Sequence, residues 1–275
     1  MKKRDKKTII YSDPVNDEFS GVGPRPKITV GKNYPYIRRG PIYRFFRFIV
    51  YKIIMLPVAH LYCFFKFRVK FVGREKIVPY KKTGMFIYGN HTQIPGDAFI
   101  PNVLLSPHDA YFVVNPDNVA LRGTRMFMTM VGAIPTPTEI GGFGPFGKAI
   151  EQRISEGAAV VIFPEAHIWP YYVGIRPFAS TSFRYPAKSG SPVFSLTVTY
   201  RRGRTGRPRV VAYVDGPFFA EGSVREAQEA LREAVYSAMC SRAETPDNYE
   251  FVVYKPACGT DVGERTEGTS SSGRI

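Results

Sequence analysis

Short apolar runs alternate with segments of helical periodicity over most of the chain. Continuous apolar runs rich in β-branched or aromatic residues predict strands that are buried on both faces. The predicted strands are 67–73, 85–89, 110–114, 158–165, 193–200 and 209–214. The predicted helices are 98–105, 120–130, 144–156 and one that begins at Ser223, where Ser223 and Glu226 form a capping-box pattern. This alternation predicts one α/β domain with a central mixed, largely parallel sheet flanked by helices.

Residues 41–68 combine apolar and basic side chains. Their longest stretch without charge, 53–65, has thirteen residues, whereas a bilayer crossing needs about twenty. At helical spacing Arg44 and Arg47 lie opposite an apolar face, and Pro57 predicts a kink or an end. We therefore predict two short amphipathic helices that lie on an anionic membrane surface. A helix that only covers the sheet is the alternative, and a transmembrane helix is the weaker option.

Both ends of the chain lack periodicity. Residues 1–40 begin with basic side chains and continue rich in Gly and Pro, and residues 259–275 are rich in Gly, Ser and Thr. We predict that both are poorly ordered. The predicted organisation is a basic N-terminal segment (1–40), the amphipathic segment (41–68), the α/β domain (69–258) and a tail (259–275).

Composition narrows the choice of partner and compartment. The chain has 275 residues, of which 44% are hydrophobic, so it can form a sizeable core. Its 38 Lys and Arg against 23 Asp and Glu leave a net charge of +15, which implies an anionic partner. Cys63, Cys240 and Cys258 are far apart and form no CxxC pair. This usage predicts reduced thiols, a cytosolic domain and no metal site built on cysteine.

Histidines are scarce, since the chain has four. His91 follows the predicted strand 85–89 directly, and Asp97 stands at the start of the next helix. The carboxyl ends of strands in α/β sheets present side chains to ligands. A turn through Pro95 and Gly96 can bring the Asp97 carboxylate to the imidazole, where it would fix the tautomer and raise the basicity.

Two motifs carry a resemblance to a known family. Asn90-His91 is followed by Asp97, and Phe163-Pro164-Glu165 follows a buried strand. Over about residues 69–214 the chain resembles the lysophosphatidate and glycerol-phosphate acyltransferase family, as a divergent member. The family has four residues between His and Asp, and this chain has five.

The second motif departs from the family pattern after its third residue. Ala166, His167 and Ile168 stand where the family has Gly-Thr-Arg, and no Arg lies around 132–139. These departures bear on the identity of the acceptor, and not primarily on the His-Asp chemistry that the resemblance implies.

The resemblance implies an O-acyltransferase similar to 1-acylglycerol-3-phosphate acyltransferases, active in phospholipid biosynthesis. His91 would act as general base and Asp97 would orient it. The acyl donor would be acyl-CoA or an acyl-carrier protein, with no permanently bound cofactor, and the acceptor would be a lysophospholipid or a glycerol-phosphate-like lipid precursor. Asn90 and Glu165 would shape the acceptor pocket, with His167 as a further lining residue.

Basic residues near these motifs are candidates for binding anionic groups of the substrates. They are Lys148, Arg176 and Arg184. Residues 142–148 fit the spacing of a phosphate-binding loop, but Ala149 replaces the Ser or Thr that holds magnesium, so we expect no ATP site.

Two other functions compete with acyl transfer. A metal-dependent hydrolase would use His91 and Asp97 with Glu165 or His167 as ligands. A noncatalytic protein that binds acidic lipid or RNA would use the net charge and the basic turn 201–207. That turn has no interleaved aromatics, so we expect a solvated hairpin and no nucleic-acid partner. The predicted location is the cytoplasmic face of the cell membrane, peripheral or monotopic.

Overall fold

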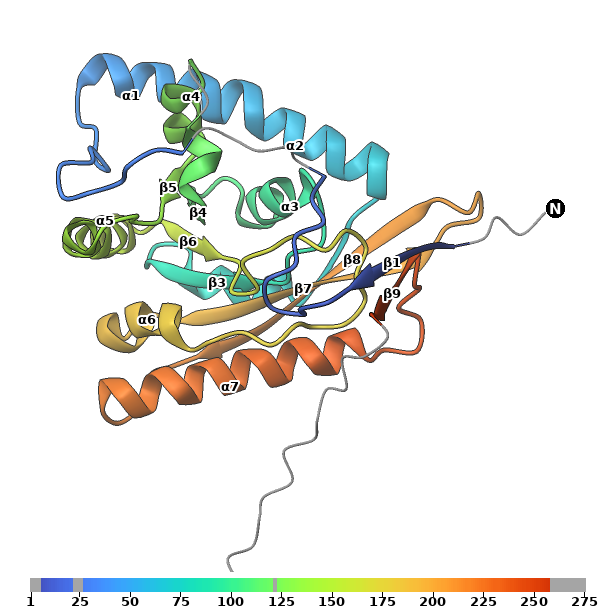
Figure 1. The fold of residues 1–275 in the computed structure, drawn as a ribbon. Helices are drawn as coiled ribbons and strands as arrows, with labels where there is room; N and C mark the ends of the chain where they lie inside the picture. Colours follow the sequence, from blue (N-terminus) through green and yellow to red (C-terminus); the bar gives the residue numbers. More distant parts are fainter. Residues whose placement is uncertain (1–5, 22–26, 121–122, 258–275) are drawn as a thin grey trace, which may run out of the picture.

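The computed structural model describes residues 6–21, 27–120 and 123–257. Seven strands form the main sheet in the order β2–β8–β7–β3–β6–β4–β5 (Figure 1). All neighbours pair in parallel except β7 and β8. The strands are β2 (Lys70–Val72), β3 (Met85–Gly89), β4 (Ala110–Val114), β5 (Ala133–Pro135), β6 (Ala159–Ile162), β7 (Val193–Arg202) and β8 (Pro208–Phe218).

Helices cover both faces of this sheet, as the sequence predicted (Figure 1). The α-helices of the domain are α3 (Gly96–Leu105), α4 (Arg125–Met130), α5 (Phe143–Ser155), α6 (Arg184–Ser189) and α7 (Val224–Ala243). Short 3-10 helices are η3 (Arg74–Tyr80), η4 (Pro116–Val119), η5 (Ile140–Gly142) and η6 (Thr181–Phe183). The Ser223–Glu226 capping box is present at the start of α7.

Strand β3 lies between two hydrophobic cores. Its alternate side chains point to opposite faces, so Met85 and Ile87 join the core under α3, while Phe86 and Tyr88 join the core under α5 and α7. All four side chains are fully buried. A strand buried on both faces has no polar positions, which is why its sequence is a continuous apolar run.

One predicted helix is shorter than its periodicity indicated. The pattern predicted a helix over 120–130, but α4 begins at Arg125. Gly123 has φ +82, in the left-handed region, which interrupts any right-handed helix.

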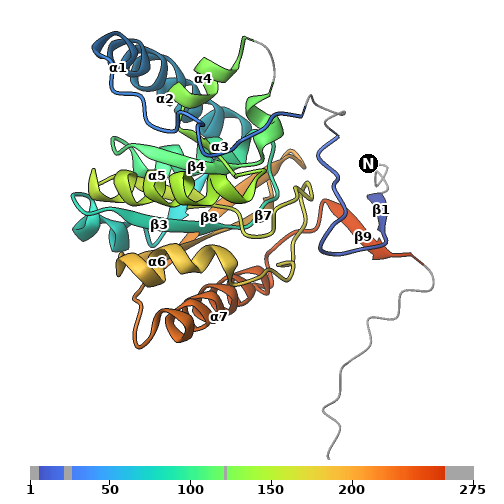
Figure 2. The same ribbon diagram turned by 60° about the vertical axis from the view of Figure 1, so that its left-hand side comes forward.

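The prediction that residues 1–40 are poorly ordered is wrong for the part that the structure describes. Strand β1 (Lys7–Tyr11) pairs in parallel with β9 (Val252–Pro256), and this small sheet lies beside the main one (Figure 2). Val30 is fully buried, and its N–H donates to Thr138 Oγ1 at 2.8 Å. The sequence lacked periodicity here because these residues pack as irregular chain on distant segments. The predicted tail 259–275 lies outside the described residues.

The amphipathic segment forms one helical run from Pro41 to Phe67, not two helices. It consists of α1 (Pro41–Phe48), the π-helical η1 (Ile49–Met55), α2 (Leu56–Tyr62) and the π-helical η2 (Cys63–Phe67). The wider turn of the π-helix just before Pro57 accommodates the proline ring, so the run continues.

This run is 27 residues long and reaches a mean hydropathy of 1.8 over its most apolar window, of which 22% is buried. By length and composition it could cross a membrane, a criterion that core helices of soluble proteins also meet. It lies along the top of the domain in Figure 1. Large apolar side chains such as Phe45 and Phe65 are 61% and 74% exposed, so the described part of the chain leaves one face of the run uncovered.

Polar contacts attach the other face to the domain. The Tyr51 hydroxyl donates to Asn102 Oδ1 at 2.6 Å and accepts from the Ala110 N–H at 3.0 Å. Asp109 pairs with Arg47 at 2.7 Å and with Lys52 at 2.5 Å. Burial raises the pKa of Asp109, but these two cations outweigh it and hold that pKa below its usual range.

We predict that Asp109→Asn loosens the helical run. Loss of the charged partner for Arg47 and Lys52 should lower the free energy of unfolding by on the order of 1–3 kcal/mol at neutral pH. Because folding lowers the pKa of Asp109, its contribution is complete at neutral pH and disappears as the pH falls through that lowered pKa. Urea denaturation across acidic and neutral pH measures this.

The matched control is Glu221→Gln, at an exposed residue. It should change stability by less than about 0.5 kcal/mol. A stability difference for Asp109→Asn that stays constant into strong acid would contradict this role of the ion pair.

Candidate functional site

The predicted catalytic residues lie where two parallel strands end side by side. β3 and β6 pair in parallel, so the residues after Gly89 and after Ile162 emerge at the same edge of the sheet. His91 follows β3, and Phe163 and Glu165 follow β6. This edge is the usual ligand-binding position of an α/β sheet.

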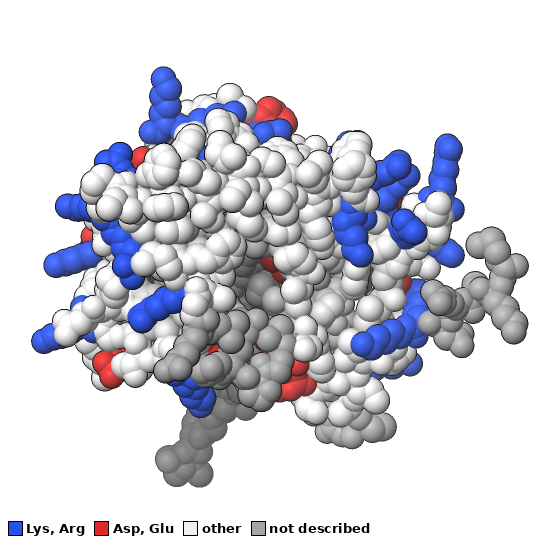
Figure 3. Space-filling model, turned by 90° about the horizontal axis from the view of Figure 1, so that it is seen from above, with Lys and Arg blue, Asp and Glu red and all other residues white. Residues whose placement is uncertain are grey.

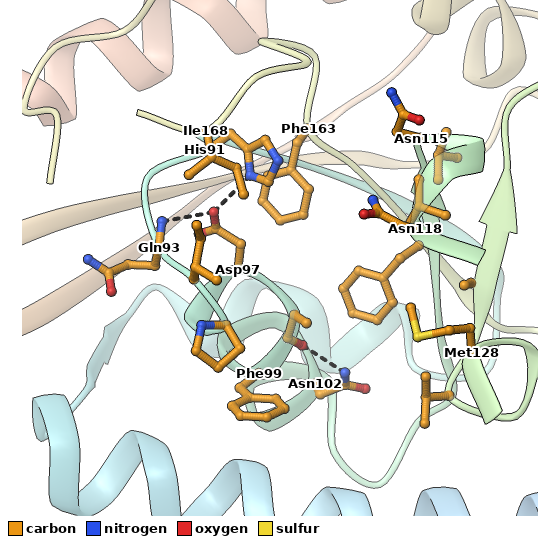
Figure 4. Close-up of a pocket in the computed structure, with 18 of the residues that line it drawn as sticks. His91, Gln93, Asp97, Phe99, Asn102, Asn115, Asn118, Met128, Phe163 and Ile168 are labelled. Carbon is orange, nitrogen blue, oxygen red and sulfur yellow. Dashed lines mark hydrogen bonds and ion pairs between the residues drawn. The ribbon is translucent and has the colours of Figure 1, made fainter. Parts of the chain in front are cut away.

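His91 and Asp97 form the predicted pair. His91 Nδ1 lies 2.8 Å from Asp97 Oδ2 (Figure 4). An ionised carboxylate can only accept, so Nδ1 carries the proton and Nε2 keeps a free lone pair. No described residue hydrogen-bonds to Nε2, and the ring lines a cavity. Burial raises the pKa of Asp97, and the His91 ring opposes that shift only in part.

The five-residue spacing is absorbed by a tight turn. The Asp97 N–H donates to the Gln93 carbonyl at 3.0 Å, and the Gln93 N–H donates back to Asp97 Oδ2 at 2.9 Å. Asp97 is the second residue of α3, so the helix fixes its backbone while the turn closes on its side chain. Two donors therefore hold Oδ2 in place, the Gln93 N–H and the imidazole.

Tyr200, near the C-terminal end of β7, holds this turn in place through its hydroxyl group. Its hydroxyl lies 2.7 Å from Thr92 Oγ1 and accepts from Gln93 Nε2 at 2.8 Å. All three side chains are buried. Sequence reasoning missed Tyr200 because it is more than a hundred residues from the turn and stands in a strand pattern that explains it fully.

The imidazole is also held face to face with Phe163. The ring centroids are 4.6 Å apart and the planes are tilted by 18°. Gly89 makes room for this ring, because a Cβ at Gly89 would lie 2.7 Å from Phe163. Phe163, the first residue of the second motif, thus has a positioning role at His91.

Glu165 is a fully buried carboxylate that joins the two motifs. It accepts from the His91 N–H at 3.3 Å, from the Arg176 N–H at 3.2 Å and from Arg176 Nη2 at 3.3 Å. Burial raises the pKa of Glu165, and the Arg176 charge acts against that shift. Arg176 is 1% exposed and also donates to the His167 carbonyl. Arg176 therefore serves Glu165, not the anionic group of a substrate.

Of the other predicted site residues, Asn90 has a structural role and His167 lines the cavity, whereas Lys148 and Arg184 do neither. Asn90 is buried and bonds to both backbone groups of Val198, so it extends the pairing of β3 with β7. His167 lines the cavity and pairs with Glu18 at 3.0 Å. Lys148 on α5 and Arg184 on α6 are exposed and do not line it. The predicted binding of substrate anions by Lys148, Arg176 and Arg184 thus has no support in the geometry.

The cavity beside His91 has a volume of about 510 Å³ and is largely apolar. In Figure 4 His91 lies at one side of it and Met128 at the other. Its walls come from the helical run 41–67, from α3, from β4 and β5 and from α4. Wall residues that sequence reasoning missed include Met55, Leu56, Phe112, Asn118, Met128 and Val131. None of the described lining residues is Lys or Arg.

The N-terminal segment covers the loop that carries Glu165. The Trp169 indole N–H donates to the Asp17 carbonyl at 2.8 Å, and Arg176 Nη1 donates to the Pro14 carbonyl at 3.3 Å. Trp169 also stacks on Tyr254 of β9, with centroids 4.9 Å apart. No pattern in the sequence signals these contacts, because they join segments more than eighty residues apart.

The chain matches no protein-family model and no curated protein. Within the described residues, no group of three or more His, Cys, Asp or Glu side chains is arranged to hold a metal ion.

We predict that Arg176→Met destabilises the protein strongly. It leaves Glu165 as a buried carboxylate without its cation, which typically costs about 3–5 kcal/mol. Guanidinium denaturation measures the effect, and Arg184→Met at an exposed position is the matched control. A loss no larger than that of the control would contradict the structural role of Arg176.

Proposed function

We propose that the protein is an O-acyltransferase that moves a fatty acyl group from a thioester to a hydroxyl of a lipid acceptor. The observation that carries this proposal is the His91–Asp97 pair, whose free Nε2 borders a largely apolar cavity. The resemblance of the two motifs to acyltransferases points to the same chemistry.

His91 acts as general base in this proposal. Nε2 removes the proton of the acceptor hydroxyl while Asp97 stabilises the imidazolium through Nδ1. The hydroxyl oxygen attacks the thioester carbonyl, the carbon–sulfur bond then breaks, and the leaving thiolate takes the proton back from Nε2. The products are an ester and a free thiol, and no acyl-enzyme forms.

The cavity fits the acyl chain better than the acceptor's phosphate. Its lining is apolar beyond His91, Asp97 and His167, with Asn and Gln amides as the main polar additions. Such surfaces bind hydrocarbon through burial of apolar area. The acceptor headgroup would then stay at the mouth of the cavity, next to His167.

The uncovered face of the run 41–67 favours a membrane-bound enzyme. Met55, Leu56 and Ala59 of this run line the cavity, while Phe45, Phe64 and other apolar residues of the run are largely exposed. A helix attached along one side to a domain suits insertion at the membrane interface. We infer a peripheral or monotopic protein on the cytoplasmic, anionic leaflet, with acyl-CoA or acyl-carrier protein as donor.

The decisive test combines two variants at the pair. His91→Ala and Asp97→Asn should each lower acyl transfer by about 10²–10⁴-fold, because each removes the general base or its orientation. Purified protein is incubated with acyl-CoA or acyl-carrier protein and a panel of lysolipids and glycerol phosphate, and ester formation is measured.

His108→Ala is the control, since His108 does not line the cavity. It should retain wild-type turnover. Equal activity of all three variants would remove the mechanism, and binding of lipid without any turnover in the wild type would favour a noncatalytic lipid-binding protein.

The cavity makes a separate prediction on chain length. Met128→Trp adds bulk at the side of the cavity away from His91, so long-chain donors should react more slowly while short-chain donors keep their rate. Competition between a short and a long acyl-CoA measures the ratio directly. An unchanged ratio would mean that the acyl chain lies elsewhere.

A further inference from the structure

A second concave site lies at the far end of the helical run, away from His91. Lys66 and Arg68 at the end of the run face Arg204, Arg207 and Arg209 of the β7–β8 hairpin across a cavity of about 490 Å³. We call this site the hairpin pocket. Phe65 also lines it, and none of its described lining residues is acidic.

The hairpin reaches this position because its strands are longer than their neighbours. β3 pairs with β7 only as far as Leu196, whereas β7 continues to Arg202. The extra residues carry the turn about 20 Å past the end of β3. The turn then lies beside the end of the helical run, as Figure 1 shows.

Two backbone features place cations in the hairpin pocket. Arg68 has φ +46, a left-handed conformation that ends the run and redirects the chain. Gly203 leaves space for Arg209, because a Cβ there would lie 3.1 Å from Arg209 Nε. The Gly203 N–H donates to the Arg207 carbonyl at 2.9 Å, which closes the turn.

Five cations around one concavity repel one another unless an anion lies between them. None of the five is paired by a described lining residue of the pocket, and the acidic residues Asp247 and Glu250 pair with Arg201 and Lys6 instead. Arginine recognises phosphate through paired N–H donors. The chemistry of the hairpin pocket therefore matches a phosphate group.

The surroundings indicate which phosphate. Phe64 and Phe65 are 65% and 74% exposed on the same turn as Lys66. Viewed from above, the face over the helical run is mostly uncharged, with Lys and Arg gathered toward its two ends (Figure 3). If the apolar face enters a membrane, these rings lie in the acyl region and the hairpin pocket lies at headgroup depth.

We propose that the hairpin pocket binds the headgroup phosphate of anionic membrane phospholipids. The proposal rests on the membrane docking of the helical run and adds a second, headgroup-selective contact. Together they hold the domain on the surface at two points.

The test measures sedimentation of the full chain with vesicles of phosphatidylcholine, with and without phosphatidylglycerol. Arg204→Gln/Arg207→Gln should bind anionic vesicles about 25-fold more weakly, since each basic residue near such a surface contributes about fivefold. Binding to neutral vesicles should change far less, because the choline cation of phosphatidylcholine offsets the charge of its phosphate. The control is Lys82→Gln/Arg225→Gln, which removes the same charge at exposed positions outside the hairpin pocket and should bind like wild type.

Several outcomes would overturn the proposal. Equal losses in the two double variants would reduce the effect to net charge, and unchanged binding of the hairpin variant would remove the site. Calorimetry with coenzyme A, and binding to single-stranded RNA, complete the design. If the hairpin variant loses affinity for coenzyme A but still binds vesicles, the hairpin pocket binds the soluble acyl donor. If it loses affinity for RNA but still binds vesicles, the hairpin pocket binds nucleic acid. Vesicle binding is measured without turnover, so a failure of this proposal can be distinguished from a failure of the proposed acyl transfer.

Discussion

Asp97 and Glu165 are carboxylates that the fold removes from water at the carboxyl edge of the sheet. Burying a carboxylate costs free energy unless hydrogen-bond donors surround it. Here His91 provides a donor to each of the two carboxylates. Its ring contacts Asp97 and its backbone N–H contacts Glu165. His91 therefore joins the loop after β3 to the loop after β6, and the neighbouring Thr92 carbonyl adds a second link by accepting from the Tyr171 N–H. The contacts with Asp97 and Glu165 fix the position of His91, and Phe163 packs against the face of its ring.

The cavity beside the pair is assembled from parts of the chain that have no local relation. The helical run 41–67 supplies one wall, α4 and β5 supply another, and the loop with His167 closes a third side. The run is a wall of the cavity and also carries exposed apolar side chains, so any movement of the run would change the shape of the cavity. Attachment through Asp109 and Tyr51 limits such movement. The proposed membrane contact would therefore be coupled mechanically to access to the cavity.

Local signals sufficed for six of the seven strands of the main sheet and for the His-Asp pair, whereas the short strand β5 was not predicted. β3 and β4 have the predicted bounds because strands buried on both faces appear as uninterrupted apolar runs, and Asp97 is close enough in sequence to His91 for a turn to join them. Tertiary context decided the rest. Pro57 does not end its helix because the preceding turn is π-helical. Arg176 forms an ion pair with Glu165, eleven residues away in sequence. Tyr200 and the segment 13–20 act through contacts that no periodicity encodes.

The parallel pairing of β1 with β9 joins the first and last described strands of the chain. During synthesis the segment that covers Trp169 and Arg176 must wait for residues 252–256 to leave the ribosome before β1 finds its partner. The cover over the second motif therefore depends on a strand from the far end of the described chain. The chain thus uses its last described strand to fasten a segment near its start, and the pairing closes a circuit that spans nearly the whole described sequence.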